Sequence, residues 1–216
     1  MEQPTISRVN VSLDELVPGT KAYTVLRAAR KIFLTHGFSG ATTDMIQREA
    51  AVSKSTVYAH FANKEALFIA VVDAECRIFA ETINAIRFSP GKLRETLSEL
   101  ASAYLKILLS ESGLALHRII VAEGPRFPAI ARMFFKAGPN VIIALVSDLL
   151  SRAESSRELD FGNITQDEAA RVFIHLVRSE PQFLSLIHPD YSSSQEHIQR
   201  WALIAVETFM RAYQHE

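Results

Sequence analysis

The chain has 216 residues, of which 48% are hydrophobic and 22% charged, a composition typical of a globular protein with one or two domains. Its single cysteine, Cys76, excludes an internal disulfide and any zinc site built from several cysteines, and it fits a reducing compartment. The N-terminal stretch lacks the apolar segment of a secretory signal, and the longest apolar run, 141–146, is too short to span a bilayer. We therefore expect a soluble, cytoplasmic protein with no membrane partner, cofactor or metal.

The net charge of −1 conceals an uneven distribution of charge along the chain. Residues 20–64 include seven basic and two acidic side chains, so this stretch carries +5 and the remainder carries −6. A basic N-terminal module on an acidic body is typical of a nucleic-acid-binding protein with a separate second domain. Charge alone also fits a solvated surface with no partner, so the motifs must decide between the two.

The chain begins with a stretch, 1–19, that shows no helical period and ends in Pro18 and Gly19. We expect a mobile arm there. A helix is predicted over 21–36, because apolar residues recur on one face at helical spacing while basic residues occupy the other. Gly37 closes this helix, since glycine reaches the left-handed conformation without steric cost, and Phe38 can then fold back onto the last turn.

Two short helices separated by a tight turn are expected over 42–61. Thr42 and Ser53 each precede a helical stretch, and their hydroxyls can accept hydrogen bonds from the free N–H groups of the first turn. Only Ala51 and Val52 remain to turn the chain between these helices. This spacing predicts a helix-turn-helix unit, whose second helix enters the major groove of DNA.

The second of these short helices presents a polar face. Val57 and Phe61 are four residues apart and can pack inward together. The side chains left to point outward are Lys54, Ser55, Thr56 and Tyr58. One cation and three hydroxyls suit a phosphate-lined groove, where short donors let the backbone approach closely. Asn63 then caps a further helix, and Lys64 at its first position adds a cation to the same side.

The block 37–67, with the helix before it, resembles the DNA-binding domain of the tetracycline-repressor (TetR/AcrR) family of bacterial transcription regulators. The matching residues are Gly37, Phe38, Thr42, Thr43, Ile46, Ala50, Val52, Ser53, Thr56, Val57, Tyr58, His60, Phe61 and the run 63–67. The positions that contact phosphates in the family correspond to Thr43, Tyr58, His60 and Lys64. Those at or beside the base edges correspond to Lys54, Ser55 and Thr56, and the resemblance adds Thr42 and Ser53 to the expected DNA-binding set.

Two residues depart from the family pattern. Ala51 stands where the family usually has glycine, and alanine in a left-handed conformation costs about 1 kcal/mol, so the turn is either strained or shaped differently. Asp44 stands where many members carry arginine. A carboxylate cannot bind phosphate favourably, but it can accept a hydrogen bond from a cytosine amino group, so its role stays open.

The remainder of the chain has helical periodicity and no alternating strand pattern. A long helix is expected over 64–88, and turn signals separate further helices over 92–110, 113–123, 127–136, 139–154, 166–179 and 195–214. We therefore predict an all-α fold. It comprises a three-helix helix-turn-helix domain over 20–67 and a helical effector-binding and dimerisation domain over 68–216. The segment 122–140 also resembles the C-terminal domain of some AcrR-like regulators.

The helices predicted over 166–179 and 195–214 have apolar residues on more than one face. In the last helix one stripe comprises Ile198, Trp201, Ala202, Ala205 and Phe209, and a second comprises Leu203, Val206, Met210 and Tyr213. A terminal helix has one face to give to its own core, so we predict that both helices pair with their copies in a four-helix bundle across a two-fold axis. The alternative is a well-packed monomer core.

The helices over 92–154 would enclose any small molecule that the protein senses. The candidate effector-binding residues are His117, Arg118, Phe127, Phe134, Phe135 and Ser147. Each aromatic among them also fits a plain core role. A metal site formed by His117 and Glu123 is not favoured, because residues six apart lie on different faces of a helix. An apolar or aromatic small molecule is the expected effector of an interhelical pocket with few polar groups.

These features predict a ligand-responsive transcriptional regulator, a repressor, that binds a palindromic DNA operator as a homodimer and is released by a small-molecule effector. A non-specific architectural DNA-binding protein and a helical enzyme are the alternatives. The chain has no Gly-x-Ser-x-Gly, Walker, dinucleotide-binding, His-Glu-x-x-His or Cys-x-x-Cys motif, so we expect no catalytic residue.

Overall fold

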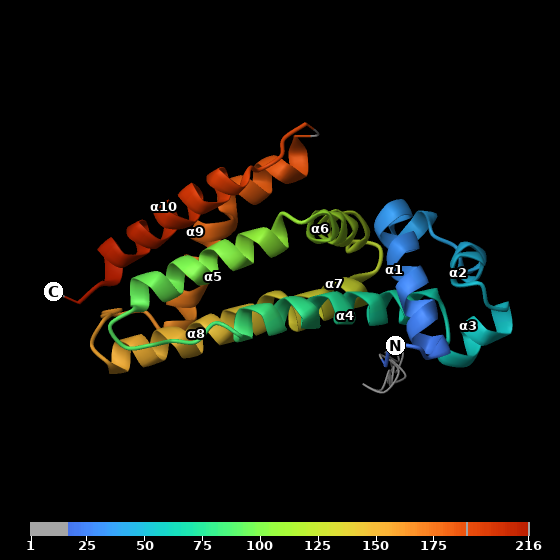
Figure 1. Cartoon of the computed structure of the whole chain (residues 1–216), viewed down its shortest axis with the longest axis horizontal. Helices are drawn as coiled ribbons and strands as arrows, with labels where there is room; N and C mark the ends of the chain where they lie inside the picture. Colours follow the sequence, from blue (N-terminus) through green and yellow to red (C-terminus); the bar gives the residue numbers. More distant parts are fainter. Residues whose placement is uncertain (1–16, 189, 216) are drawn as a thin grey trace, which may run out of the picture.

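The computed structural model describes residues 17–188 and 190–215, and within these ranges it contains ten α-helices (Figure 1). The predicted all-α fold is confirmed, whereas most of the expected N-terminal arm lies outside the described residues. The helices are α1 (Lys21–Gly40), α2 (Thr43–Ala50), α3 (Lys54–His60), α4 (Lys64–Asn84), α5 (Leu93–Leu108), α6 (Glu111–Glu123), α7 (Pro128–Ala137), α8 (Pro139–Ser155), α9 (Gln166–Ile187) and α10 (Gln195–Tyr213).

Helix α1 contains the predicted glycine break. Gly37 has φ 71° and ψ 175°, an extended region with positive φ that is essentially open to glycine alone, and it is not the left-handed helical conformation expected from the sequence. Phe38 folds back as predicted and is buried. Its ring centroid lies 6.1 Å from that of Phe33 and 5.1 Å from that of Phe68 of α4. The break thus directs an aromatic side chain into the core.

The predicted helix caps and the turn between α2 and α3 are present. Each of three cap residues accepts a hydrogen bond from the backbone N–H three residues later, at 2.7–3.2 Å, and these residues are Thr42, Ser53 and Asn63. Ala51 has φ 52° and ψ 42°, which is the left-handed conformation. The turn therefore keeps the geometry that glycine would adopt, and the alanine is strained.

Two hydrophobic clusters form the core of the protein. The first includes the buried faces of α1, α2 and α3, continues along α4 to Cys76, and takes in residues of α6 and α7. The second joins α5, α8, α9 and α10. Figure 1 shows α4 running from the three-helix end along the body of the molecule. The boundary predicted after residue 67 therefore falls inside a continuous cluster.

Helix α9 is longer than predicted. The predicted helix ended at residue 179, two residues before Pro181. Proline in a helix interior removes a backbone hydrogen bond. The helix instead continues through Pro181 to Ile187. The Val177 carbonyl would accept the N–H of residue 181 in a regular helix, and here it accepts the indole N–H of Trp201 at 3.0 Å. A side chain of α10 thus replaces the missing backbone donor.

Two further differences concern the end of α4 and the start of α6. Helix α4 ends at Asn84 and not near residue 88. Helix α6 begins at Glu111 and not at residue 113, because the hydroxyl of Ser110 caps it by accepting the Gly113 N–H at 3.0 Å. The other ends in the C-terminal part fall within two residues of the predictions.

The stretch Pro128–Ser155 is long and apolar enough to cross a membrane when judged by length and composition alone. It consists of α7 and α8, which meet at Gly138 with φ −106° and ψ −88°. Arg132, Lys136 and Asp148 are exposed along it, and charged side chains are costly in lipid. Its chemistry fits two amphipathic helices packed on α4 and α9.

Ala51→Gly should raise the free energy of unfolding by about 0.5–1 kcal/mol, because glycine relieves the left-handed strain, although its greater freedom in the unfolded chain offsets part of the gain. Urea denaturation measures this change. Ala144→Gly is the matched control at an exposed position within α8, where glycine should destabilise by about 1 kcal/mol. An equal loss of stability at both positions would contradict the left-handed turn.

Candidate nucleic-acid interface

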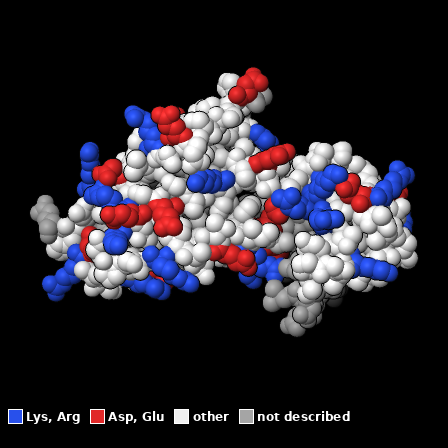
Figure 2. Space-filling model, in the orientation of Figure 1, with Lys and Arg blue, Asp and Glu red and all other residues white. Residues whose placement is uncertain are grey.

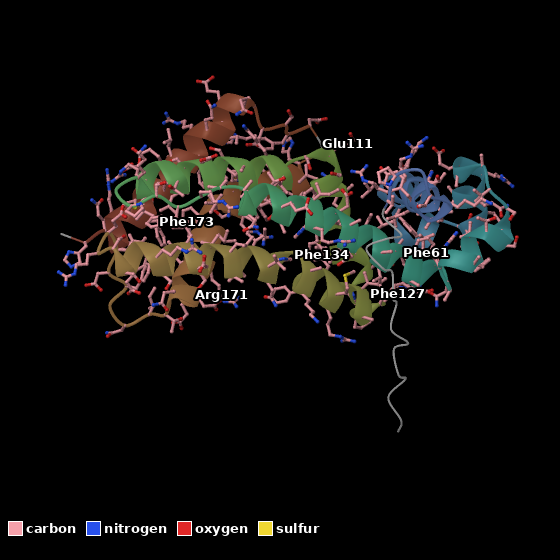
Figure 3. All side chains as sticks on the ribbon, turned by 60° about the horizontal axis from the view of Figure 1, so that its bottom comes forward. Phe61, Glu111, Phe127, Phe134, Arg171 and Phe173 are labelled. Carbon is pink, nitrogen blue, oxygen red and sulfur yellow. The ribbon has the colours of Figure 1, made fainter. Side chains whose placement is uncertain are left out.

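Helix α3 presents a polar face to solvent at the end of the molecule opposite the C-terminus (Figure 1). Val57 and Phe61 are buried against α1 and α2, with 1% and 3% of their surfaces exposed (Phe61 is labelled in Figure 3). Lys54, Ser55 and Tyr58 are exposed, and Thr56 is half-buried. The predicted inward and outward faces of this helix are therefore both present.

Three hydroxyls gather at the beginning of α3. The Ser53 Oγ lies 2.8 Å from both the Ser55 Oγ and the Thr56 Oγ1, and it also accepts the Thr56 N–H at 3.1 Å. The cap thus holds these side chains together at the surface. Hydroxyls of this kind can donate to phosphate oxygens and to base edges.

Tyr58 joins α3 to the start of α2. Its hydroxyl lies 3.3 Å from the Thr43 Oγ1, and 44% of the tyrosine surface is exposed. The structure thereby brings together two residues that the family resemblance places at phosphate contacts. His60 is half-buried at the other end of α3, with its ring 6.5 Å from that of Phe61.

Asp44 forms an ion pair with Lys54, in which the Nζ and Oδ1 atoms are 3.0 Å apart and each side chain is 54% exposed. The carboxylate raises the pKa of the Lys54 amine through its hydrogen bond and its charge. An exposed pair of this kind contributes little to stability. It does orient the cation at the predicted base-edge position, a role for Asp44 that the sequence did not indicate.

Lys64 has contacts within the protein that the sequence did not reveal. Its Nζ donates to the carbonyls of Phe38 and Ala41, at 3.0 and 3.1 Å, and lies 4.6 Å from the Phe38 ring centroid. The ammonium group therefore holds the segment 38–41 that links α1 to α2. A lysine has three N–H donors, so one remains for the predicted phosphate contact.

The connection between α6 and α7 holds the same segment from another side. The Glu123 carboxylate accepts the Ser39 N–H at 3.0 Å, and the Arg126 guanidinium lies 3.5 Å from the Ser39 hydroxyl. The Phe127 ring packs edge-on against Phe38, with centroids 4.8 Å apart (Phe127 is labelled in Figure 3). Phe127, which was predicted to bind the effector, thus lies at the junction with the three-helix unit.

The other predicted effector residues are dispersed through the body. His117 and Phe134 line a small, partly open cavity of about 60 Å³, with ring centroids 6.4 Å apart. Arg118 instead donates to the Ser185 carbonyl at 2.7 Å. Phe135 is 49% exposed, and Ser147 is half-buried away from the cavity. The cavity also includes Tyr104 and Arg178, which sequence periodicity did not single out.

Figure 2 shows Lys and Arg side chains over the end formed by α1–α3, and charges of both signs interleaved over the rest of that face. Part of the basic charge at this end is already paired, because Lys31 contacts Glu49 at 2.8 Å and Lys54 contacts Asp44. Among the described residues, no cluster of three or more His, Cys, Asp or Glu side chains could hold a metal ion.

Glu123→Gln should destabilise the protein at neutral pH. Hydrogen bonds from Ser39 and the nearby cations lower the pKa of Glu123 below its ordinary value of 4.5. A lowered pKa in the folded state stabilises the protein above the ordinary value, and this stability is lost as the pH falls through the folded value. The difference in melting temperature between wild type and Glu123→Gln should therefore shrink below about pH 4.5. Glu81→Gln, at an exposed glutamate, is the control, and a pH-independent difference would contradict this role.

Two family models match the chain. "Bacterial regulatory proteins, tetR family" matches residues 25–71, and "AefR-like transcriptional repressor, C-terminal domain" matches residues 95–215. The HTH-type transcriptional regulator UidR of Escherichia coli K12 is 34% identical over 113 residues. That match covers 50% of this chain and 54% of UidR, so the chain spans about half the length of this relative.

Solved structures with the same fold extend the likeness over most of the chain. The Flavonoid-responsive Regulator FrrA is 36% identical, with a TM-score of 0.75 over 90% of this chain and 97% of FrrA. A TetR transcriptional regulator from Agrobacterium tumefaciens is 23% identical, with a TM-score of 0.74 over 92% of this chain and 96% of its own, and shares the fold. Because one model covers the three-helix unit and the other covers more than half of the chain, this protein belongs to the TetR family of transcriptional regulators.

Proposed function

We propose that the protein is a ligand-responsive transcriptional repressor, which acts in the cytoplasm, binds a palindromic operator as a homodimer and leaves it when a small-molecule effector binds. The observation that carries this proposal is the exposed polar face of α3, set on a unit whose core continues into α4, α6 and α7. A helix with an exposed polar face and a buried apolar one suits insertion into the major groove.

The proposed DNA-binding side chains form two groups, one placed to reach base edges and one placed to reach phosphates. Lys54, Ser55 and Thr56 are at the start of the helix, which in a helix-turn-helix protein approaches the base edges. Thr43 of α2, Tyr58 and His60 of α3, and Lys64 of α4 would bind phosphates, with Thr42 and Ser53 as caps. Phosphate contacts fix the protein on the duplex, and base contacts select the sequence.

Exposed apolar residues on α9 and α10 support a homodimer. Val172, Phe183 and Ile187 recur along one side of α9 with 40–61% of their surfaces exposed. Leu203 and Ile204 of α10 are 53% and 44% exposed. Exposed apolar side chains on two packed helices are candidates for an interaction site, and a palindrome requires two copies of α3 at a fixed spacing.

This apolar surface is narrower than the sequence suggested. Residues of both predicted stripes are buried within the core of the same chain, Val206 and Met210 of the second stripe among them. Helix α10 therefore gives two neighbouring faces to its own core. What remains for the partner subunit is the strip formed by Leu203 and Ile204, together with the side of α9.

The effector would act by favouring one of two arrangements of the dimer. A ligand shifts such an equilibrium only by the difference between its affinities for the two states, commonly about 1–3 kcal/mol. FrrA is described as flavonoid-responsive, and flavonoids are aromatic. This agrees with an aromatic or apolar effector in the helical body.

Lys54→Ala should change which operator sequence is preferred, because a lost base contact costs about 1–3 kcal/mol at one position. Tyr58→Phe, which removes only the hydroxyl, should weaken binding to selected and random duplexes alike. Fluorescence anisotropy at several salt concentrations, with an operator selected from random DNA by the purified protein, measures both effects. Lys92→Ala, an exposed lysine outside the three-helix unit, is the control. Equal affinity of the wild type for the selected and random duplexes would favour a non-specific DNA-binding protein instead.

Phe183→Asp should dissociate the dimer, because a charge in an apolar interface commonly costs 2 kcal/mol or more, about a thirtyfold increase in the dimer dissociation constant. Analytical ultracentrifugation measures this constant. Phe135→Asp is the matched control, since Phe135 is similarly exposed but lies on α7. A wild-type protein that remains monomeric at micromolar concentration would contradict the homodimer.

A further inference from the structure

The small cavity lies where six helices meet. Each helix from α4 to α9 contributes a side chain to its wall, and these include Phe79, Tyr104, His117, Phe134, Ile142 and Arg178. Most of the wall is apolar, and Figure 3 labels Phe134 on α7. A molecule held here would contact every helix that joins the three-helix unit to the dimer surface.

Arg178 brings a positive charge to this apolar cavity. It is half-buried, and its Nε donates to the Gln182 Oε1 at 2.7 Å. Within residues 17–188 and 190–215, no carboxylate forms an ion pair with the Arg178 guanidinium. A charge that is partly removed from water without a counter-ion is unfavourable. The cavity is therefore electrostatically complementary to an anion.

The polar neighbours of Arg178 do not neutralise it. Burial, and then the charge of Arg178, lower the pKa of His117, so the imidazole is neutral at pH 7. Burial raises the pKa of the Tyr104 phenol, and the nearby guanidinium offsets part of that rise, so the phenol also stays neutral. The three side chains together carry one positive charge and can donate hydrogen bonds to an anionic oxygen.

A wider groove lies outside the cavity and shares part of its wall. This groove has a volume of about 1070 Å³ and lies among α1, α4, α5 and the start of α6. Phe79 and Ile107 line both spaces, so these two side chains separate them. A cavity of 60 Å³ is too small for a ligand, since ligand pockets measure about 300–1,000 Å³. Moving Phe79 and Ile107 would join the two spaces.

The charges of the groove are mixed and do not select a ligand by its sign. Four basic and three acidic residues line it: Arg27, Arg30, Arg77 and Lys106, and Glu75, Glu81 and Glu99. Arg30 and Glu75 are already bound to each other, at 2.6 and 3.0 Å. Among the residues that line the small cavity, Arg178 carries the one formal charge, so it is the group that would discriminate between ligands.

We propose that the effector is an aromatic carboxylate, whose anionic group binds Arg178 in the small cavity while its ring occupies the space opened between Phe79 and Ile107. The inference rests on the proposed function and specifies the chemical class of the effector. A guanidinium binds a carboxylate through two parallel hydrogen bonds, which neutral amides cannot match. Entry of the ring displaces Phe79 of α4, the helix that begins with Lys64.

The test uses the full-length protein and pairs of aromatic acids with their neutral primary amides, such as benzoate, cinnamate, 4-hydroxybenzoate and 1-naphthoate. Isothermal titration calorimetry gives each affinity, and anisotropy gives release of the selected operator. At least one acid should bind the wild type tenfold or more tightly than its amide and should release the operator. Arg178→Met should abolish that preference, and Arg171→Met should keep it, since Arg171 is exposed on the same helix and paired with Asp167 at 2.9 Å.

Phe79→Ala provides a second measurement that leaves Arg178 intact, because shortening this wall residue should speed association of the same acid. Equal binding of acids and amides, retention of the preference in Arg178→Met, or no binding of any acid at millimolar concentration would overturn the inference. Neutral phenols that bind more tightly than every acid would overturn it as well. Failure of the proposed function would be seen separately, as the absence of sequence-specific DNA binding by the wild type without any ligand.

Discussion

The orientation of α3 depends on an aromatic cluster that the three-helix unit cannot complete by itself. Phe38 lies at its centre and contacts Phe33 of α1, Phe68 of α4 and Phe127, which precedes α7. Protein interiors are packed as densely as organic crystals, so rotation of the unit about residues 61–64 would separate Phe33 and Phe38 of α1 from Phe68 and Phe127. The DNA-binding surface is therefore fixed to the helical body through a shared core, and not through a single flexible linker.

The free energies of these contacts are similar in size to the coupling free energy that regulation by a ligand requires. An aromatic pair contributes about 0.5–1.5 kcal/mol beyond the burial of its surface, and a hydrogen bond to a charged group such as that of Lys64 or Glu123 contributes about 1.5–3 kcal/mol. Coupling between an effector site and a DNA site typically requires about 1–3 kcal/mol. Loss of one or two contacts to the segment 38–41 would supply that amount, while the rest of the cluster keeps the unit folded.

The sequence predicted features that depend on neighbours in the chain, and missed those that depend on distant ones. The caps Thr42 and Ser53 and the strained Ala51 follow from residues within one helical turn. By contrast, α9 continues past Pro181 because of Trp201, which is 24 residues from the carbonyl that it binds. The contact of Glu123 with Ser39 spans 84 residues. Of the cavity residues, His117 and Phe134 could be predicted because a polar or aromatic side chain stands out within a predicted helix. No periodicity indicates that Tyr104 and Arg178 would lie beside them.

Helix α4 connects the cavity to the DNA-binding surface. It carries Lys64 and Phe68 at one end and Phe79 at the cavity wall, about 22 Å from Lys64 for an unbroken helix. Between them, the junction of α7 and α8 packs so closely that a Cβ atom at Gly138 would lie 3.1 Å from the Cys76 Sγ. Burial raises the pKa of Cys76 to about 12, so this contact is made by a neutral thiol. Helices α7 and α8 pack directly on α4 at this point. Helix α4 has no loop between Phe79 and Lys64, so a displacement of Phe79 would be transmitted along the helix to the segment 38–41, which Lys64 holds.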